Sequence, residues 1–96
     1  MSGKRLQPHE RREAIIEAGL SLFEECGVHI SRDALAERAG VSTGLVSYHF
    51  GHMGIFMYAL ISEGCKRRVP GLILAGLAEQ HPDALALPAS VKKKAL

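Results

Sequence analysis

The sequence predicts an all-α domain built on a helix-turn-helix, and three observations carry that prediction. The chain has 96 residues, which is enough for one small domain and leaves no room for a doubly wound sheet or a barrel. Apolar residues in the first third recur at the spacing of a helix. Two short helical segments then follow each other across Ala39-Gly40-Val41-Ser42, a turn that keeps them from being collinear.

The composition is that of a globular protein with a thin core. Hydrophobic residues make up 47% of the chain, charged residues 23%, and the mean hydropathy is +0.06. Only 5% of the residues are aromatic, so the core must come from Leu, Ile, Val and Ala, and pairing of two chains would enlarge it. Cys26 and Cys65 are too few for a disulfide scaffold and lack metal-site spacing, which indicates reduced thiols.

The first helix is expected from Pro8 to Cys26. Its apolar stripe recurs at helical offsets and consists of Ile15, Ala18, Gly19, Leu22, Phe23 and Cys26. Glutamates occupy the opposite face, and Gly27 follows where a left-handed residue ends a helix. We interpret Cys26 as a small buried residue rather than a nucleophile.

Two short helices should follow the first. Ser31 offers its hydroxyl as the N-cap of the second helix, and Gly40 ends that helix. Ser42 caps the third helix, and Val41 supplies an apolar plug beneath the turn between the two. This layout is that of a helix-turn-helix.

The second half of the chain should be helical as far as residue 80. A fourth helix is expected over about residues 52–68, and Pro70 can open another over residues 71–78, which is apolar on every face and must be covered all round. We expect residues 81–96 to be a loosely ordered tail with one short helix at most. The predicted domains are a helix-turn-helix domain over 1–51, a short helical dimerisation region over 52–80 and the tail over 81–96. The predicted core of these four or five helices is Ile15, Leu22, Phe23, Leu35, Ala36, Val41, Leu45, Phe50, Phe56 and Leu60.

Basic residues gather at the two ends of the chain. Residues 1–12 carry three net positive charges and residues 64–96 carry four, whereas residues 13–63 carry five net negative charges. The basic residues of the first segment are Lys4, Arg5, Arg11 and Arg12. This pattern fits a nucleic-acid partner, although solvated termini explain it equally well, and the lysines at 92–94 have the same two interpretations.

No feature points to an enzyme, a cofactor or a membrane protein. The sequence has no Gly-rich phosphate loop, no carboxylate cluster and no ordered set of Ser, His and Asp. His49 and His52 have helical spacing for a metal ion, but no cysteine or carboxylate completes a set. Residues 39–62 lack charge, yet they are too polar and too broken by glycine to span a membrane. We therefore expect a cytoplasmic protein without a cofactor or a metal.

The segments RREAIIEAGLSLFEECG and SRDALAERAGVSTGLVSYHFG resemble the DNA-binding domain of TetR-family transcriptional repressors. The likeness is greatest to choline-responsive regulators, which share GVSTG followed by an aromatic-His-aromatic cluster. It covers roughly residues 8–60 and rests on an ordered set of motifs, namely Leu22-Phe23, Gly27, Ala36 with AGVS, and Phe50-Gly51. The resemblance implies a repressor that binds a palindromic operator as a homodimer, with Arg11 and Arg12 near the DNA backbone.

The chain also departs from that family pattern. Its loop after Gly27 is about one residue shorter, and Met53 stands where the family commonly has a lysine that touches a phosphate. Ordinary members continue through a ligand-binding, dimerising domain, whereas here about 30 residues follow the fourth helix. We therefore expect no inducer pocket and no small-molecule inducer.

The third helix should carry the DNA contacts, because the second helix of such a pair enters the major groove with its N-terminal end nearest the bases. The candidate contacts are Ser42, Thr43, Gly44, Ser47, Tyr48 and His49, with Ser31 facing a phosphate from the start of the second helix. Hydroxyls and the Thr43 methyl can reach base edges, and Gly44 allows close backbone approach. The helix has no Arg, Lys, Asn or Gln, so specificity must rest on hydroxyls, methyls, water and DNA shape.

A two-fold operator needs two recognition helices about 34 Å apart, which calls for a dimer. The apolar segment 71–78 provides the expected interface, formed by Leu72, Ile73, Ala75, Gly76 and Leu77. Two alternatives stay open. The chain could be a protein-interaction module, a decayed helix-turn-helix that pairs with a related regulator, or it could be a truncated family member with a foreign tail.

Overall fold

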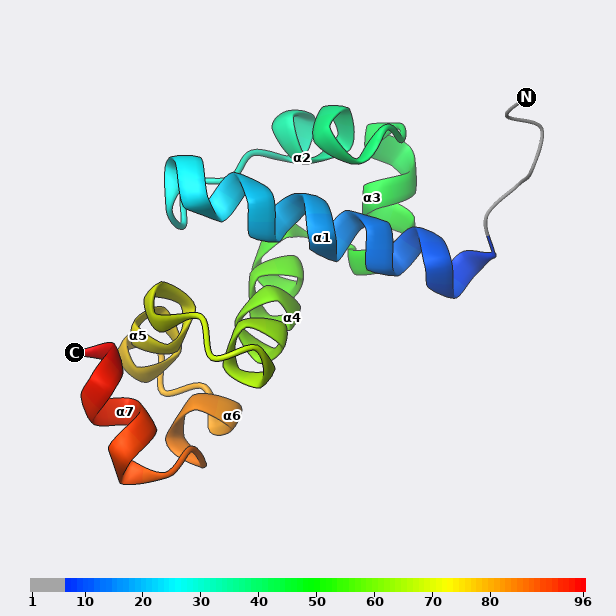
Figure 1. The fold of residues 1–96 in the computed structure, drawn as a ribbon. Helices are drawn as coiled ribbons and strands as arrows, with labels where there is room; N and C mark the ends of the chain where they lie inside the picture. The colour runs from blue at the N-terminus through cyan, green and yellow to red at the C-terminus, as the bar shows by residue number, and fades with distance from the viewer. Residues whose placement is uncertain (1–6) are drawn as a thin grey trace.

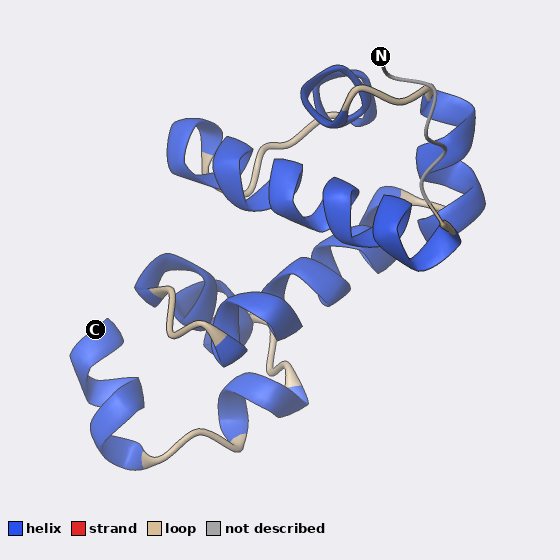
Figure 2. Cartoon of the chain, turned by 45° about the vertical axis from the view of Figure 1, so that its right-hand side comes forward, coloured by secondary structure: helices blue, strands red, loops and turns tan. Residues whose placement is uncertain are grey.

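A computed structural model of the chain describes residues 7–96, and within that range every regular element is a helix (Figures 1 and 2). The seven helices are α1 (Pro8–Cys26), α2 (Arg32–Ala39), α3 (Thr43–Phe50), α4 (Met53–Lys66), α5 (Pro70–Ala78), α6 (Pro82–Leu85) and α7 (Ala89–Ala95). The predicted all-α class is confirmed, with more helices than the four or five expected. The molecule is elongated, 46 × 22 × 22 Å, with α1–α3 at one end, α5–α7 at the other and α4 connecting them (Figure 1).

The helix α1 has the predicted bounds because its two ends are built as the sequence indicated. Pro8 occupies the first helical position, and the Glu10 carboxylate accepts a hydrogen bond of 2.8 Å from the backbone N–H of Gln7. At the other end Gly27 adopts φ +65°, and its N–H donates to the carbonyl of Phe23. Cys26 is exposed, so its assignment as a buried residue is wrong: the covered part of the apolar stripe ends before this last residue of α1.

The core runs through both halves of the molecule along α4. Of the predicted core, the residues confirmed as buried are Ile15, Leu22, Leu35, Ala36, Phe50, Phe56 and Leu60. Phe23, Val41 and Leu45 are only half-buried, and Val46, which the predicted core omitted, takes the central place on α3. The Phe50 and Phe56 rings meet edge to face with their centroids 5.2 Å apart, which joins α3 to α4.

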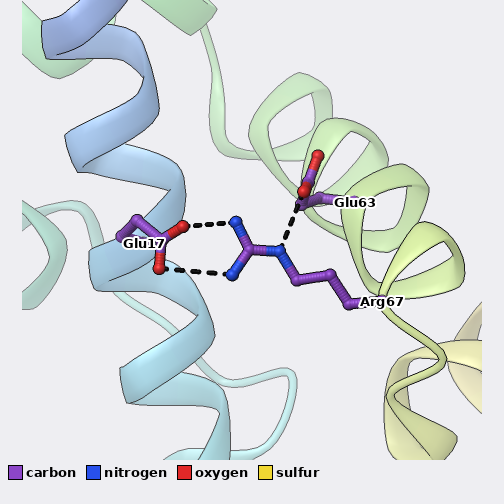
Figure 3. A network of polar contacts seen from close by, with 3 residues as sticks. All are labelled: Glu17, Glu63 and Arg67. Carbon is purple, nitrogen blue, oxygen red and sulfur yellow. Dashed lines mark hydrogen bonds and ion pairs between the residues drawn. The ribbon is translucent and has the colours of Figure 1, made fainter.

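Close backbone approach fixes α4 against α1. A Cβ on Gly19 would lie 2.5 Å from Cζ of Phe56, so only glycine lets that ring sit against α1. Arg67, at the end of α4, adds polar contacts: its guanidinium binds both carboxylate oxygens of Glu17 on α1, and its Nε donates to Glu63 at 2.8 Å (Figure 3). These two carboxylates raise the pKa of Arg67, which stays cationic.

The tail is more ordered than its prolines suggested. Residues 81–96 form the helices α6 and α7, each opening at or just after a proline. His81 caps α6: its Nδ1 accepts the N–H of Asp83 at 3.0 Å, so its Nε2 carries the proton that is donated to the Tyr58 carbonyl. The Lys92 ammonium donates to the Leu85 carbonyl at 3.0 Å and links α7 to α6.

The inner side of helix α5 is covered within its own chain. The side chain of Leu72 packs directly on Gly64 of α4, since a Cβ on that glycine would lie 2.4 Å from the Leu72 Cβ. Gly76 packs in the same way against Ala84 of α6 and Ile61 of α4. The prediction that Leu72, Ile73 and Gly76 face a second copy is therefore wrong: all three are buried in the monomer.

The outer face of α5 has a different composition from the one expected. Leu74, which was not among the predicted interface residues, is 37% exposed, and Ala75 and Leu77 are half-buried.

Among the described residues, no helix is both long enough and apolar enough to cross a membrane.

Candidate nucleic-acid interface

The turn between α2 and α3 is closed by backbone hydrogen bonds around Gly40. This glycine adopts the left-handed conformation, with φ +73° and ψ +33°, which other residues rarely adopt. The N–H of Gly40 donates to the Glu37 carbonyl at 3.2 Å, and the N–H of Val41 donates to the Ala36 carbonyl at 3.0 Å. The chain reverses within these residues, as expected for a helix-turn-helix.

Both short helices begin at the serines that the sequence indicated. The Ser31 Oγ accepts the N–H of Ala34 at 3.1 Å, and the Ser42 Oγ accepts the N–H of Leu45 at 3.1 Å. Both serines are exposed, so each hydroxyl still has its own proton to donate. Their structural role as N-caps is thus confirmed, whereas a contact with DNA stays a prediction.

The exposed face of α3 brings together four of the predicted residues. Thr43, Gly44, Ser47 and Tyr48 are spaced so that they share one side of the helix, on which Ser47 is half-buried and the other three are exposed, while Val46 and Phe50 are buried in the core. Tyr48 is 79% exposed, which is unusual for an aromatic ring and leaves it free to contact a partner. The exposed face of α3 carries hydroxyl groups, a methyl group and open backbone, and no charge.

His49 does not join this face. Its ring is half-buried on the flank of α3, where it meets the Tyr48 ring edge to face at 5.2 Å. Its Nε2 is buried without a hydrogen-bond partner. The ring therefore supports Tyr48 from the side, and its predicted phosphate contact is not accessible through that nitrogen.

Two arginines from other helices reach the C-terminal end of α3. The Arg12 guanidinium of α1 lies over the Phe50 ring, 5.1 Å from its centroid. The Arg32 Nη2 of α2 donates to the Gly51 carbonyl at 3.1 Å. The sequence analysis did not identify Arg32 as a functional residue, although its position directly after the capping Ser31 was a signal that it lies at the start of α2. Lys4 and Arg5, the other basic residues of the N-terminal segment, lie outside the described residues.

Arg38 links α2 to α1 through polar contacts at the surface. Its guanidinium donates to the Ser21 hydroxyl at 2.6 Å and to the Glu25 carboxylate at 2.9 Å. The hydrogen bond and the charge of Arg38 lower the pKa of Glu25. This interaction is present above the ordinary pKa of a glutamate and is lost as the pH falls through the lowered pKa.

A cleft lies away from α3, where α4 meets α5 and α6. Its volume is about 570 Å³, and its lining residues include Val28, Met57, Tyr58, Ile61, Ala75 and His81. Ligand sites have volumes in this range, so the structure does not support the expectation that the chain has no room for a small molecule. Within residues 7–96 no three His, Cys, Asp or Glu side chains gather where they could hold a metal ion.

Comparison with known proteins identifies the segment that holds this interface. Residues 15–53 match the family described as "Bacterial regulatory proteins, tetR family". The match runs from the middle of α1 to the first residue of α4 and so includes the turn at Gly40 and the whole of α3. No match was found among curated proteins or among solved structures. The chain therefore carries a TetR-family helix-turn-helix domain, as its sequence motifs indicated.

Proposed function

We propose that this protein is a transcriptional repressor that inserts α3 into the major groove of a specific operator. The observation that carries the proposal is the exposed face of Thr43, Gly44, Ser47 and Tyr48 on a helix-turn-helix of the TetR family. This face suits hydrogen bonds from hydroxyl groups and contact between the Thr43 methyl and a thymine methyl. The function is regulatory rather than enzymatic, and DNA binding implies a cytoplasmic location in a bacterium.

Electrostatic attraction to DNA must come from outside α3. The helix contains no Lys or Arg, but Arg12 lies beside its C-terminal end and Arg11 lies on the same turn of α1. Cations at such positions bind phosphates and position a protein without reading the sequence. In this proposal the neutral face of α3 (the reading face: Thr43, Gly44, Ser47 and Tyr48) contacts the bases, while the flanking arginines bind phosphates. Specificity then rests on DNA shape and close contact.

We further propose a homodimer, because one chain presents a single α3 and a palindromic operator needs two, about 34 Å apart. The burial of Leu72, Ile73 and Gly76 moves the proposed interface to the outer side of α5, around Leu74, Ala75 and Leu77. The exposed residues of α5 are Pro70, Leu74 and Ala78, with Ala75 and Leu77 half-buried beside them. Sedimentation at micromolar concentration tests the assembly directly, since a monomeric parent protein would contradict it.

The proposal is tested with DNA from upstream of the protein's own gene, since small repressors commonly control their own synthesis. Fluorescence anisotropy should give tighter binding to that DNA than to a scrambled duplex of equal length, with affinity that falls as salt rises. The alternative function, an interaction module that pairs with a related regulator, is favoured by the lack of charge on α3 and by Met53, which stands in place of a phosphate-binding lysine. Failure to bind any of this DNA at low salt would support that alternative.

Removing either the Tyr48 ring or the Thr43 side chain should weaken operator binding and leave the fold intact. Tyr48→Ala and Thr43→Ala should each cost about 1–3 kcal/mol of specific binding, because each removes contacts on the reading face. Tyr58→Ala is the matched control, since Tyr58 is also an exposed tyrosine but lies on α4. Circular dichroism checks the fold. If both variants bind the operator as tightly as the parent, the proposal that α3 lies in the major groove is wrong.

Gly44→Ala should separate stability from DNA binding. The added Cβ meets no atom closer than the Ser42 Oγ, at 3.7 Å, and alanine in a helix is about 0.5–1 kcal/mol more favourable than glycine. The variant should therefore unfold at a higher temperature while it binds the operator more weakly, because the methyl group intrudes where the backbone approaches DNA. Unchanged operator affinity would show that Gly44 lies away from the DNA surface.

A further inference from the structure

Arg32 spans the helix-turn-helix from the start of α2 to the end of α3. It is the first residue of α2, its side chain is half-buried, and its Nη2 donates to the carbonyl of Gly51, 19 residues further along the chain. Gly51 is the residue that ends α3, with φ +76°. The contact therefore ties the two ends of the motif together on the side opposite to the turn at Gly40.

The Gly51 carbonyl is a suitable acceptor for a guanidinium. It lies at the C-terminal end of α3, where the aligned peptide dipoles leave partial negative charge and a cation is favoured. The N–H of the same residue is already used, since it donates to the Ser47 carbonyl at 2.7 Å. The bond from Arg32 thus holds the first peptide beyond α3, between Gly51 and His52, from a fixed point on α2.

The position of Arg32 is not explained by stability alone. Its Nε is buried and has no hydrogen-bond partner, which is a cost to folding. Its burial closes only the Nε to a DNA phosphate, so the salt dependence of binding must distinguish a phosphate contact of the Nη groups from a positioning role. What the side chain does supply is a planar donor that fixes the distance between the start of α2 and the end of α3.

We propose that Arg32 is a positioning residue that sets the angle of α3 against α2, and through it the way Thr43 and Tyr48 meet the bases. This inference rests on the proposed DNA-binding function. The turn at Gly40 holds the start of α3 on α2, while Phe50, packed on Phe56, ties the end of α3 to α4 rather than to α2. Arg32 holds that end on α2 as well, so the reading face arrives at the groove already oriented.

The test compares Arg32→Met, which keeps the stem and removes the donor, with Arg38→Met, which removes an arginine that binds α1 instead. Arg32→Met should lower the ratio of specific to non-specific affinity about tenfold. The slope of log affinity against log salt should stay that of the parent, since no phosphate contact is lost. Arg38→Met should keep the parent ratio.

A phosphate contact gives the opposite pattern and would overturn the proposal: both affinities fall together, and the salt slope decreases by about one unit. A specificity ratio equal to that of the parent overturns it as well.

Residual dipolar couplings of the α3 amides, measured without DNA, test the inference apart from the proposed function. In Arg32→Met they should report a rotation of α3 relative to α2, together with a changed carbonyl resonance of Gly51. Unchanged couplings overturn the positioning role even if DNA binding is weaker. If the couplings change in Arg32→Met but the parent protein binds no operator, Arg32 does position α3, and the proposed DNA-binding function is wrong. If Arg32→Met does not fold, Arg32→Lys, which keeps the charge but has no planar fork, should show the same changes at smaller amplitude.

Discussion

Replacing Leu72 with aspartate should destabilise the protein by about 4 kcal/mol or more, which is most of the stability of a domain this small. Leu72 is 0% exposed and lies directly against Gly64, so a carboxylate there would have neither water nor a cationic partner. Either the new carboxylate takes up a proton, or α4 separates from α5 so that water reaches the carboxylate. Both changes disrupt the packing. Urea denaturation followed by circular dichroism should show the loss of the cooperative transition.

Leu74→Asp is the matched control on the same helix. Leu74 is 37% exposed, so a carboxylate at this position keeps its water and should change the unfolding free energy little. If the outer side of α5 contacts a second copy, this variant should also sediment as a folded monomer. The reverse result, with Leu72→Asp folded and monomeric and Leu74→Asp like the parent, would restore the interface that the sequence predicted.

Phe56→Ala should cost about 3–5 kcal/mol, since Phe56 is fully buried and large-to-small changes of aromatic residues leave a cavity. The ring fills the space above Gly19 and meets Phe50 edge to face, so its loss loosens α4 from both α1 and α3. Phe23, which was also predicted to lie in the core, is only half-buried, so its truncation should cost less.

Ile55→Ala provides the comparison for Phe56→Ala. Ile55 precedes Phe56 on α4 and is 50% exposed, so its truncation should change stability by well under the cost at Phe56. Thermal denaturation of both variants gives the two values. A loss at Phe56 no greater than the loss at Ile55 would contradict the assignment of Phe56 to the centre of the core.

The candidate site followed from the sequence in part. Thr43, Gly44, Ser47 and Tyr48 could be grouped because residues three or four positions apart share a face of any helix. His49 could not be excluded in the same way, since its burial depends on how α3 lies on its neighbours. Arg32 was missed because its partner, Gly51, is distant in sequence, and no local pattern indicates which carbonyl a long side chain will reach.

The sequence by itself determined the local structure of the first half: where α1 begins and ends, where Ser31 and Ser42 cap their helices, and where Gly40 turns the chain. Caps, glycine stops and helical periodicity act within a few residues, so they can be recognised without a fold. Only the tertiary structure decided which faces of α5 are covered, because an evenly apolar helix has no periodicity to show its inner side. The same holds for the tail. The helices α6 and α7 are short, and such helices owe their stability to packing against distant residues rather than to their own sequence.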